Sequence, residues 1–448
     1  MSITEKIAAA GVVGCGGAGF PTHAKLKGNI EHLIVNGAEC EPLLRTDRYI
    51  MTNKADELVA ALTALKQELN IPKCTIALKE TYREEIAALR SAIDRAKADI
   101  SLHTMTSFYP AGDEQTIVFE VTGRVVPPAG IPIAVGAVVD NVATILAVHD
   151  AISGKPLTHK YLTVTGDVKK PVVLRVPVGT SFRRCLELAG GTVSERYFVV
   201  AGGPMMGRPL TAEQAEHEVV TKTTSGILIL PEEGYHATQN SISLRHMLNR
   251  AKAACIQCSA CTQLCPRHLL GHPLAPHKIM RKMALVQDFK SNLDDPIIQS
   301  AALCCECGIC EAYACPMGLQ PRKINSLLKK ELGASGFRYQ TEAGHTYTAD
   351  EERELRKVPS ERLAARVGVL PYYHNSIKEL VEDEPNSVSI PLKMHIGAPA
   401  VPVVAPGDEV KCGQLIAACP DGALGSNIHA SISGRVTAVG STIEIAEF

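Results

Sequence analysis

The sequence predicts a multidomain α/β protein with four modules, and three observations support this prediction. The chain has 448 residues, which is too long for one core of ordinary size. Its first 155 residues alternate β-rich runs with helical stretches, a pattern typical of an α/β layer fold. A cysteine-rich middle is followed by a C-terminal stretch of short strands and Pro and Gly turns, which predicts a small β barrel or sandwich.

The points at which these patterns change predict the module boundaries. We expect an α/β domain at residues 1–155, a small α+β domain at 156–235, a helical cysteine-rich domain at 236–340, a linker at 341–385 and a β barrel or sandwich at 386–448. Individual elements are expected as strands at 32–35, 74–78, 161–165, 172–176 and 197–201, and as helices at 55–69, 83–98, 181–189 and 276–287.

Charge and composition exclude several classes of function. The 46 Lys and Arg residues balance 47 Asp and Glu, so the chain has no overall positive electrostatic field that would attract nucleic acid or an anionic membrane. Trp is absent and aromatic residues are only 4%, which argues against base stacking. No apolar run approaches the roughly 18 residues of a spanning helix, and the N-terminus lacks the pattern of a signal peptide. We therefore expect a cytoplasmic protein without nucleic-acid partners or direct membrane insertion.

Two cysteine runs carry the strongest chemical signal. Fifteen cysteines without a secretion signal favour metal or redox chemistry over disulfides. The first run has the spacing C-x2-C-x2-C-x3-C-P of bacterial ferredoxins, and the second differs only by x4 before its last cysteine. The predicted ligands of two [4Fe-4S] clusters are Cys255, Cys258, Cys261 and Cys265 in the first run, and Cys304, Cys307, Cys310 and Cys315 in the second.

In two-cluster ferredoxins the fourth cysteine of each run binds the other cluster. We therefore pair the first three cysteines of the first run with Cys315, and the first three of the second run with Cys265. Structural zinc is the alternative, because C-x2-C pairs also bind zinc. Cys305 is a spare thiol, either a ligand by a register shift or a packed free cysteine. The other cysteines are expected to be mostly small core residues.

A glycine-rich segment near the N-terminus satisfies G-x-G-x-x-G at residues 14–19. Alone it is weak evidence for nucleotide binding, because residues 4–10 look helical and leave little room for the strand that a dinucleotide fingerprint needs. A flexible glycine turn is the alternative. Three polar segments, at residues 36–42, 109–114 and 140–144, support the same interpretation as the glycines, a nucleotide site.

Together these segments resemble the flavin and NADH site of the FMN-binding subunit of respiratory complex I. They resemble more closely the Rnf-complex C subunit and the cobalamin reductases of propanediol-utilisation microcompartments. The glycines of residues 202–207 belong to the same pattern. The resemblance covers essentially the whole chain. It implies a Rossmann-like FMN/NADH domain, an SLBB-like β-grasp domain, a two-cluster ferredoxin domain and a barrel-sandwich domain.

The resemblance also implies the site residues. Backbone amides of the glycines would approach the FMN phosphate and ring, with a lysine supplying charge. Other positions would line the flavin or hold the nicotinamide nucleotide. The implied set is Gly14, Gly16, Gly17, Gly19 and Lys25 for the phosphate and ring; Asn36, Glu39, Gly112, Asp113, Glu114, Asn141 and Thr144 for the flavin; and Phe20 and Glu41 for NADH. Cys15 replaces an arginine common in complex I, and Ala38 replaces an acidic residue, which weakens the NADH assignment more than the FMN assignment.

The C-terminal module resembles the barrel-sandwich fold of biotinyl and lipoyl carriers. A carrier presents a lysine on its central hairpin, and the hairpin at residues 421–426 has none. We therefore expect a docking or packing domain. In the Rnf-complex C subunit the corresponding module precedes the flavin domain, so its C-terminal position here favours the cobalamin reductases.

The expected function is therefore electron transfer from NADH through FMN and two [4Fe-4S] clusters to cobalamin. No protein side chain is expected to act as a catalytic acid or base. The resemblance implies cobalamin or a cobalamin adenosyltransferase as partner, with a microcompartment shell protein as a further partner, and a place in the microcompartment lumen. The alternatives are an electron-input subunit of a membrane ion-pumping complex and a non-enzymatic electron conduit docked to a shell protein.

Overall fold

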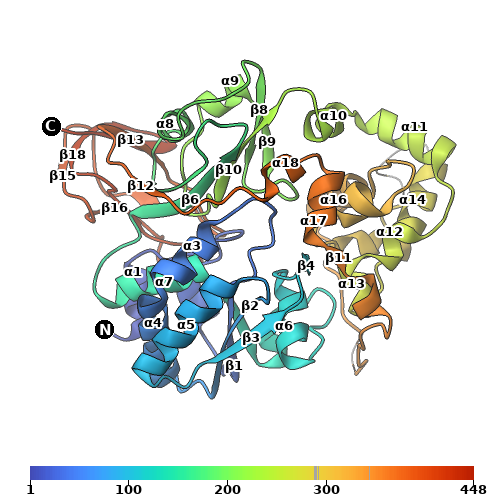
Figure 1. The fold of residues 1–448 in the computed structure, drawn as a ribbon, viewed down its shortest axis with the longest axis horizontal. Helices are drawn as coiled ribbons and strands as arrows, with labels where there is room; N and C mark the ends of the chain where they lie inside the picture. The colour runs from blue at the N-terminus through green and yellow to red at the C-terminus, as the bar shows by residue number, and fades with distance from the viewer. Residues whose placement is uncertain (287–289, 291, 343) are drawn as a thin grey trace.

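The computed structural model describes residues 1–286, 290, 292–342 and 344–448. Four modules follow one another along the chain, and Figure 1 shows the cysteine-rich helices and the C-terminal strands at opposite ends of the molecule. Among the described helices, none combines the length and the apolar character needed to cross a membrane.

The first module is a parallel four-stranded sheet in the order β3-β2-β1-β5. Its strands are β1 His32–Asn36, β2 Lys73–Lys79, β3 Ser101–Met105 and β5 Ala137–Asn141. Successive side chains of β1 point to opposite faces, as a strand requires. Leu33 and Val35 join the larger core with several helices, whereas Ile34 joins a second core with Ile117. Helices therefore cover both faces of the sheet.

Helices precede, connect and follow the strands of this module. Two of the helices that pack into the larger core, α4 and α5, begin at the predicted residues because their apolar side chains repeat with helical spacing. The predicted helix at residues 4–10 is also present, as α1. The helices are α1 Ile3–Ala9, α2 Thr22–Lys25, α3 Thr46–Asn53, α4 Ala55–Glu68, α5 Arg83–Ala96, α6 Glu114–Thr122 and α7 Val142–Ile152, with the short turn η1 Pro132–Val135.

A mixed six-stranded sheet forms the second module, in the order β12-β7-β6-β10-β8-β9. Two short helices pack on one face of this sheet around Phe182 and Cys185. The elements are β6 His159–Gly166, β7 Val172–Pro177, α8 Phe182–Leu188, β8 Tyr197–Ala201, β9 Arg208–Thr211, α9 Ala212–Glu216, β10 Gly226–Pro231 and β12 Leu380–Glu382. This is the predicted small α+β domain with one strand added from later in the chain.

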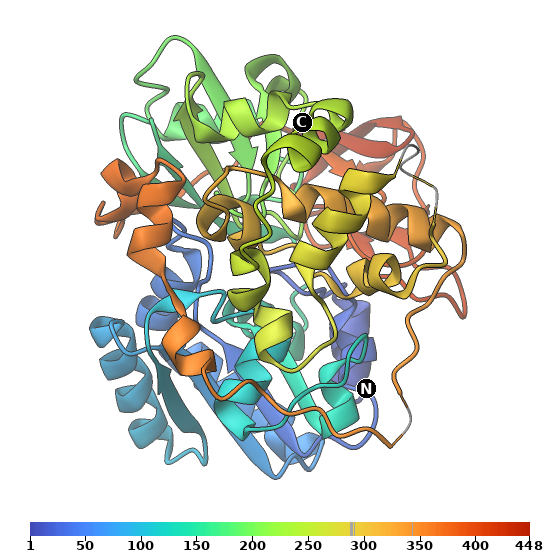
Figure 2. The same ribbon diagram turned by 90° about the vertical axis from the view of Figure 1, so that its right-hand side faces the viewer.

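The third module is helical, as predicted. The predicted helix at 276–287 is α14, which ends at Leu285, while Gln287 lies outside the described residues. Figure 2 shows these yellow and orange helices facing the viewer. They are α10 Tyr235–Ser241, α11 Leu244–Ala254, α12 Ala260–Gln263, α13 Pro266–Leu269, α14 Pro276–Leu285, α15 Pro296–Gln299 and α16 Pro321–Ala334, with the short turns η2 Ser300–Leu303 and η3 Cys310–Ala314.

The stretch from 341 to 385 crosses back over the earlier modules. β11 pairs with β4 of the first module, and β12 pairs with β7 of the second. The elements are β4 Phe108–Tyr109, η4 Arg353–Arg356, β11 Val358–Pro359, α17 Ser360–Arg366 and α18 Leu370–Tyr373. The domain boundaries given above stay predictions, and these pairings add that the expected linker contributes strands to two other modules.

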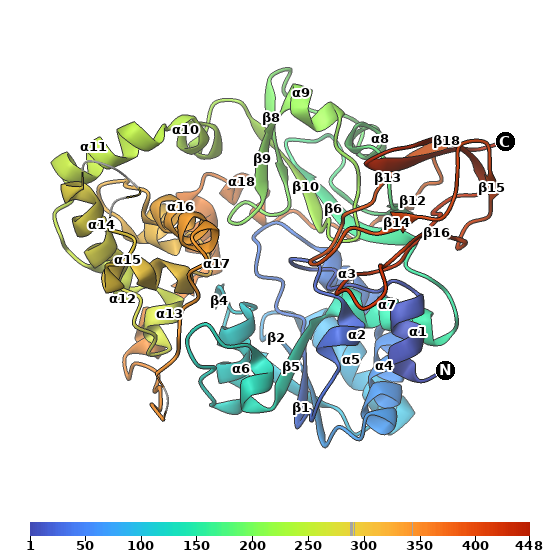
Figure 3. The same ribbon diagram turned by 180° about the vertical axis from the view of Figure 1, so that it is seen from behind.

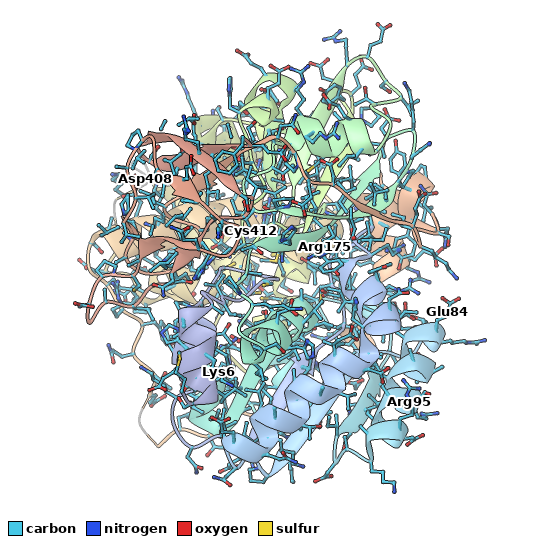
Figure 4. All side chains as sticks on the ribbon, turned by 90° about the vertical axis from the view of Figure 1, so that its left-hand side faces the viewer. Lys6, Glu84, Arg95, Arg175, Asp408 and Cys412 are labelled. Atoms are coloured by element: carbon cyan, nitrogen blue, oxygen red, sulfur yellow. The ribbon has the colours of Figure 1, made fainter. Side chains whose placement is uncertain are left out.

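The C-terminal module consists of two small antiparallel sheets that share one core, including Ile390, Ile416 and Ile443. In Figure 3 it lies beside the N-terminal helices. Its Cys412 is exposed, unlike most of the scattered cysteines, and Figure 4 labels it near Arg175. The strands are β13 Ser387–Pro391, β14 Val401–Pro402, β15 Glu409–Val410, β16 Leu415–Ala418, β17 Ile428–His429, β18 Gly434–Val439 and β19 Thr442–Ala446.

Candidate flavin and iron–sulfur site

The glycine-rich segment forms a loop that contacts from the first and second modules hold in place. The N–H of Gly14 donates to the carbonyl of Phe20 at 2.9 Å, which closes the loop. The N–H of Cys15 donates to Thr144 Oγ1 at 2.9 Å, and the carbonyl of Cys15 accepts from Lys160 Nζ at 2.7 Å. These contacts fix the peptide that precedes the central glycines.

Two glycines of this loop have different reasons to lack a side chain. A Cβ on Gly16 would lie 2.7 Å from Cγ of Asn141, so the packing of the protein itself excludes one. A Cβ on Gly17 would meet no atom within 4 Å. The backbone at Gly17 is therefore open to the close approach of a ligand.

The loop borders a cavity of about 560 Å³, a size typical of cofactor sites. Eight of the predicted residues line it: Gly16, Gly17, Asn36, Glu39, Glu41, Gly112, Asp113 and Asn141. Asn36 Nδ2 donates to the carbonyl of Gly112 at 2.8 Å, which joins two of the polar segments. Volume and lining together fit an FMN molecule.

Six predicted residues lie outside this lining: Gly14, Gly19, Phe20, Lys25, Glu114 and Thr144. Lys25 forms ion pairs with Glu114 at 2.7 Å and with Asp140 at 3.7 Å. Burial opposes the charge of Lys25, but these two carboxylates raise its pKa overall. The charge of Lys25 is thus directed at side chains of its own module.

Acidic residues in the cavity wall are perturbed by burial. Burial raises the pKa of Glu39 well above its usual value, and the neighbouring charge of Asp47 raises it further. Burial likewise raises the pKa of Asp47, although Asp47 Oδ2 accepts from Asn141 Nδ2 at 2.7 Å. Perturbed carboxyl groups of this kind cluster at functional sites.

Glu41 connects the first module to the glycine segment of the second. Its carboxylate accepts hydrogen bonds from the N–H of Met205 at 2.8 Å and the N–H of Met206 at 2.9 Å. Burial raises its pKa to about 7. A Cβ on Gly203 would lie 2.2 Å from Cβ of Glu41, so this segment needs a glycine.

Thiols of the two cysteine runs line two further, small cavities. Cys255, Cys258, Cys261 and Cys315 line the first, which we call the outer set, and Cys265, Cys304, Cys307 and Cys310 line the second, the inner set. Each set combines three cysteines of one run with the last cysteine of the other. In the described part of the chain, no three His, Cys, Asp or Glu side chains are placed close enough together to hold a single metal ion. The thiols instead border a space, a geometry that fits a cluster.

The inner set lies next to the flavin cavity. Cys305 and Cys307 line that cavity as well as the small cavity of the inner set. Tyr109 Oη donates to the carbonyl of Cys307 at 2.8 Å. A buried ion pair joins the same two modules, because Arg267 contacts Asp113 at 2.5 and 2.9 Å. The spare thiol Cys305 therefore lies between the two candidate cofactor sites.

Sequence reasoning missed several residues of this site. Arg267 directly follows the Cys-Pro of the first run, and Asp47 lies in α3. Lys160 and Lys222 are buried lysines of the second module, and Lys222 Nζ donates to the carbonyl of Gly11 at 2.7 Å. None belongs to a recognisable motif, so only tertiary contacts reveal them.

A second cavity, of about 640 Å³, shares the wall formed by Glu39, Cys40 and Glu41. Its other sides come from Arg45, Lys79 and residues near α18. It has neither the glycine loop nor a cluster thiol in its lining. We therefore assign the flavin to the smaller cavity.

Comparison with known protein families identifies all four modules. Residues 7–150 match the Nuo51 FMN-binding domain, 161–209 the SLBB domain, 254–320 a 4Fe-4S dicluster domain and 368–447 the RnfC barrel sandwich hybrid domain. These matches confirm the predicted fold class and the predicted cofactors, FMN and two [4Fe-4S] clusters. Fold and site together define a flavin and iron–sulfur oxidoreductase.

Individual relatives narrow this class. The chain is 43% identical to the cobalamin reductase PduS of Salmonella typhimurium over 440 residues, which cover 98% of this chain and 94% of the relative. The chain belongs to this cobalamin reductase family. It is also 36% identical over 60% of its length to the C subunit of the Na⁺-translocating ferredoxin:NAD⁺ oxidoreductase complex of Acetobacterium woodii, of which 58% is covered.

A solved structure resembles the fold. An NAD⁺-reducing [NiFe]-hydrogenase in the H₂-reduced state matches with a TM-score of 0.50 at 22% identity, covering 73% of this chain and 62% of that chain.

Gly17 offers a test of the flavin assignment that spares the protein fold. Gly17→Ala is expected to leave the melting temperature of the flavin-free protein unchanged, because a Cβ there meets no protein atom. FMN should bind about tenfold more weakly, a loss of about 1.4 kcal/mol, because the methyl group would occupy the ligand's approach. Fluorescence titration with FMN measures the change. Gly333→Ala is the control, since a Cβ there also meets open space. Equal FMN affinity in both variants would contradict the assignment.

Proposed function

We propose that this protein is an NADH-dependent flavin and iron–sulfur oxidoreductase that reduces cobalamin. One observation carries the proposal: a single cavity has the glycine loop in its lining together with Cys307 of the inner set and the neighbouring Cys305. A flavin held there would contact the cluster module directly. The name of the Salmonella typhimurium relative supports cobalamin as the final acceptor.

Bound FMN supplies the conversion between a hydride, which carries two electrons, and single electrons. The chain's own residues would bind the FMN and orient it. Gly17 leaves the backbone open to the ligand, and the contacts of Cys15 with Thr144 and Lys160 hold the loop in place. The hydrogen bond between Tyr109 and the carbonyl of Cys307 fixes the cluster loop against the flavin domain. No step needs a side chain to donate or accept a proton.

Glu41 is proposed to hold the ribose of the nicotinamide nucleotide. Its carboxylate lies in the cavity wall, and Met206 beside it is 55% exposed at the edge of the site. Phe20, at 37% exposure, is the ring proposed to stack on the nucleotide. Phe20 lies outside the flavin lining, so the nucleotide would extend from the cavity past the glycine loop.

The proposed setting is the lumen of a bacterial microcompartment, with a cobalamin adenosyltransferase as the recipient and a shell protein as a further partner. The resemblance to the microcompartment enzymes supports this setting. A second candidate function is electron input to a membrane ion-pumping complex, which the 36% identity to the Acetobacterium woodii protein favours.

An anaerobic assay separates the two candidates. The purified protein, loaded with FMN and clusters, is mixed with NADH and cob(III)alamin without any membrane component. One NADH should reduce two cob(III)alamin molecules to cob(II)alamin, with NAD⁺ and a proton as the other products. NADH oxidation with ferricyanide but not with cobalamin would favour the ion-pumping role.

The pKa of Glu41 predicts a pH dependence for NADH binding. Because burial raises this pKa to about 7, Glu41 becomes a charged hydrogen-bond acceptor only as the pH rises through about 7. NADH binding should tighten over this range. In Glu41→Gln the inflection should disappear, and binding at high pH should be at least about tenfold weaker, since a hydrogen bond to a charged group contributes about 1.5–3 kcal/mol.

Titration of flavin bleaching against NADH at several pH values measures this effect. Glu84→Gln, which changes an exposed carboxylate paired with Lys378, is the control and should keep the inflection. An unchanged inflection in Glu41→Gln would remove Glu41 from the nucleotide site.

A further inference from the structure

The cysteine-rich module has an uneven charge distribution in a chain that is otherwise balanced. From Tyr235 to Val286 the sequence contains no Asp or Glu. The same stretch contains the cations Arg245, Arg250, Lys252, Arg267, Lys278, Arg281 and Lys282. Because the whole chain has a net charge of −1, this concentration of positive charge must be offset elsewhere in the chain.

Three of these cations are engaged within the protein. Arg267 pairs with Asp113, Lys282 pairs with Asp295 at 2.6 Å, and Arg250 donates to the carbonyls of Met317 and Gly318. The other four are exposed: Arg245 and Lys252 on α11, and Lys278 and Arg281 on α14. Within the described residues, no carboxylate is within ion-pair distance of these four. We call them the basic rim.

The basic rim belongs to the two helices that flank the outer cysteine set. α11 ends at Ala254, directly before Cys255, and α14 contributes His277 and Met280 to the lining of the outer set. The two helices pack against each other. Figures 1 and 3 both show them at the end of the molecule remote from the C-terminal module. The outer set is therefore the part of the electron path that faces solvent.

Apolar side chains are exposed at the loops of the outer set itself. Ile256 is 61% exposed and Met317 is 37% exposed, and both line the small cavity of this set. Cys258 is also exposed. The inner set differs, because Cys265, Cys304, Cys307 and Cys310 are all buried. A partner could thus reach the outer set directly, whereas the inner set is enclosed by protein.

We propose that the loops of the outer set and the basic rim form a docking face for a redox protein whose surface around its own cofactor is acidic. This proposal rests on the proposed function, since it assigns the outer set as the exit of the electron path. A single electron passes between the reduced cluster and the oxidised cofactor of the partner, and no bond is formed or broken. Four cations spaced over two helices suit the extended charged surface of a protein partner.

The physical basis is steering of the encounter by charge. Opposite charges on two proteins raise association rates by about 10- to 1,000-fold at low salt, and salt removes the effect. A small apolar centre with a charged rim also suits the small interfaces of transient electron-transfer complexes. Ile256 and Met317 would supply the centre and the four cations the rim.

The test uses an acidic [2Fe-2S] ferredoxin, chemically reduced, as the electron donor to the cofactor-loaded protein. In the variant Arg245→Glu/Lys252→Glu/Lys278→Glu/Arg281→Glu, the second-order rate constant should fall by at least about tenfold at low ionic strength. The ferredoxin dissociation constant, measured by calorimetry, should rise in parallel. At high salt, the rate constants of the variant and the wild type should become equal. Basic cytochrome c, as acceptor, should react faster with the variant than with the wild type.

The matched control reverses four exposed lysines elsewhere: Lys155→Glu, Lys169→Glu, Lys170→Glu and Lys411→Glu. Iron content, FMN content and NADH–ferricyanide activity should be unchanged in both variants. Absence of that activity in the wild type as well would indicate failure of the proposed function and not of the docking face. Equal ferredoxin rates and affinities in the two variants would overturn the proposal. So would charge-sensitive binding to vesicles containing anionic lipid together with no binding of ferredoxin.

Discussion

Alanine in place of Cys265 is expected to abolish the cluster of the inner set, although Cys265 belongs to the first cysteine run. Its thiol lines the same small cavity as Cys304, Cys307 and Cys310. About four of about eight irons should be lost. FMN should stay bound and should still be reduced by NADH, while reduction of the remaining cluster by NADH should fall to background. Iron analysis and electron paramagnetic resonance after mixing with NADH measure both effects.

Cys315→Ala is the matched control for this prediction. Its thiol lines the outer set, so this variant should lose the outer cluster and keep NADH-driven reduction of the inner one. If each alanine instead removed the cluster of its own run, the crossed pairing would be wrong. Cys185→Ala, at a buried cysteine of the second module, should leave both clusters intact.

Asparagine in place of Asp113 is expected to weaken the junction between the flavin and cluster modules. Burial opposes ionisation of Asp113, but the guanidinium of Arg267 lowers its pKa overall. Because both side chains are largely buried, loss of the carboxylate leaves an unpaired charge, at a cost of about 3–5 kcal/mol. Native-state hydrogen exchange of the amides of α13 should show opening that is easier by about this free energy.

The same ion pair predicts a dependence on pH. Since the pKa of Asp113 is depressed below its usual value of 3.8, the stabilisation is fully present above that value. It is lost as the pH falls through the lower pKa of the folded protein. Asp113→Asn should not show this loss. Asp56→Asn, at an exposed pair with Arg95, is the control and should cost less than about 1 kcal/mol. Equal opening in Asp113→Asn and wild type would contradict the role of the pair.

Local patterns made the fold and the clusters predictable. The strand at 197–201 and the starts of α4 and α5 coincide with the predictions, because side-chain periodicity and β-branched runs are properties of adjacent residues. The cysteine spacing likewise predicted how the thiols group, because a cubane demands three ligands from one tight loop. The match to a dicluster domain at 254–320 confirms the cluster type.

Long-range contacts could not be predicted in the same way. Arg267 and Asp113 are 154 residues apart in sequence, and no motif indicates that they meet. Lys25 was expected to offer its charge to FMN, but Glu114 and Asp140 surround it. The expected linker supplies β12 to a sheet formed mainly by residues 159–231. An edge strand such as β7 has unpaired backbone N–H and C=O groups, which can form hydrogen bonds with any extended segment of suitable register. Such details depend on tertiary packing.

The central claim is that electrons pass from the nucleotide through FMN to the inner and then the outer cluster. Anaerobic stopped-flow mixing of the loaded protein with NADH tests it most directly. After confirmation of one FMN and about eight irons, we expect flavin bleaching first and loss of cluster absorbance second. In the wild type the cluster absorbance should fall in two steps, the inner cluster before the outer one, and only the later step should be absent in Cys315→Ala. Zinc in place of iron, or bleached clusters with oxidised flavin throughout, would contradict this electron path.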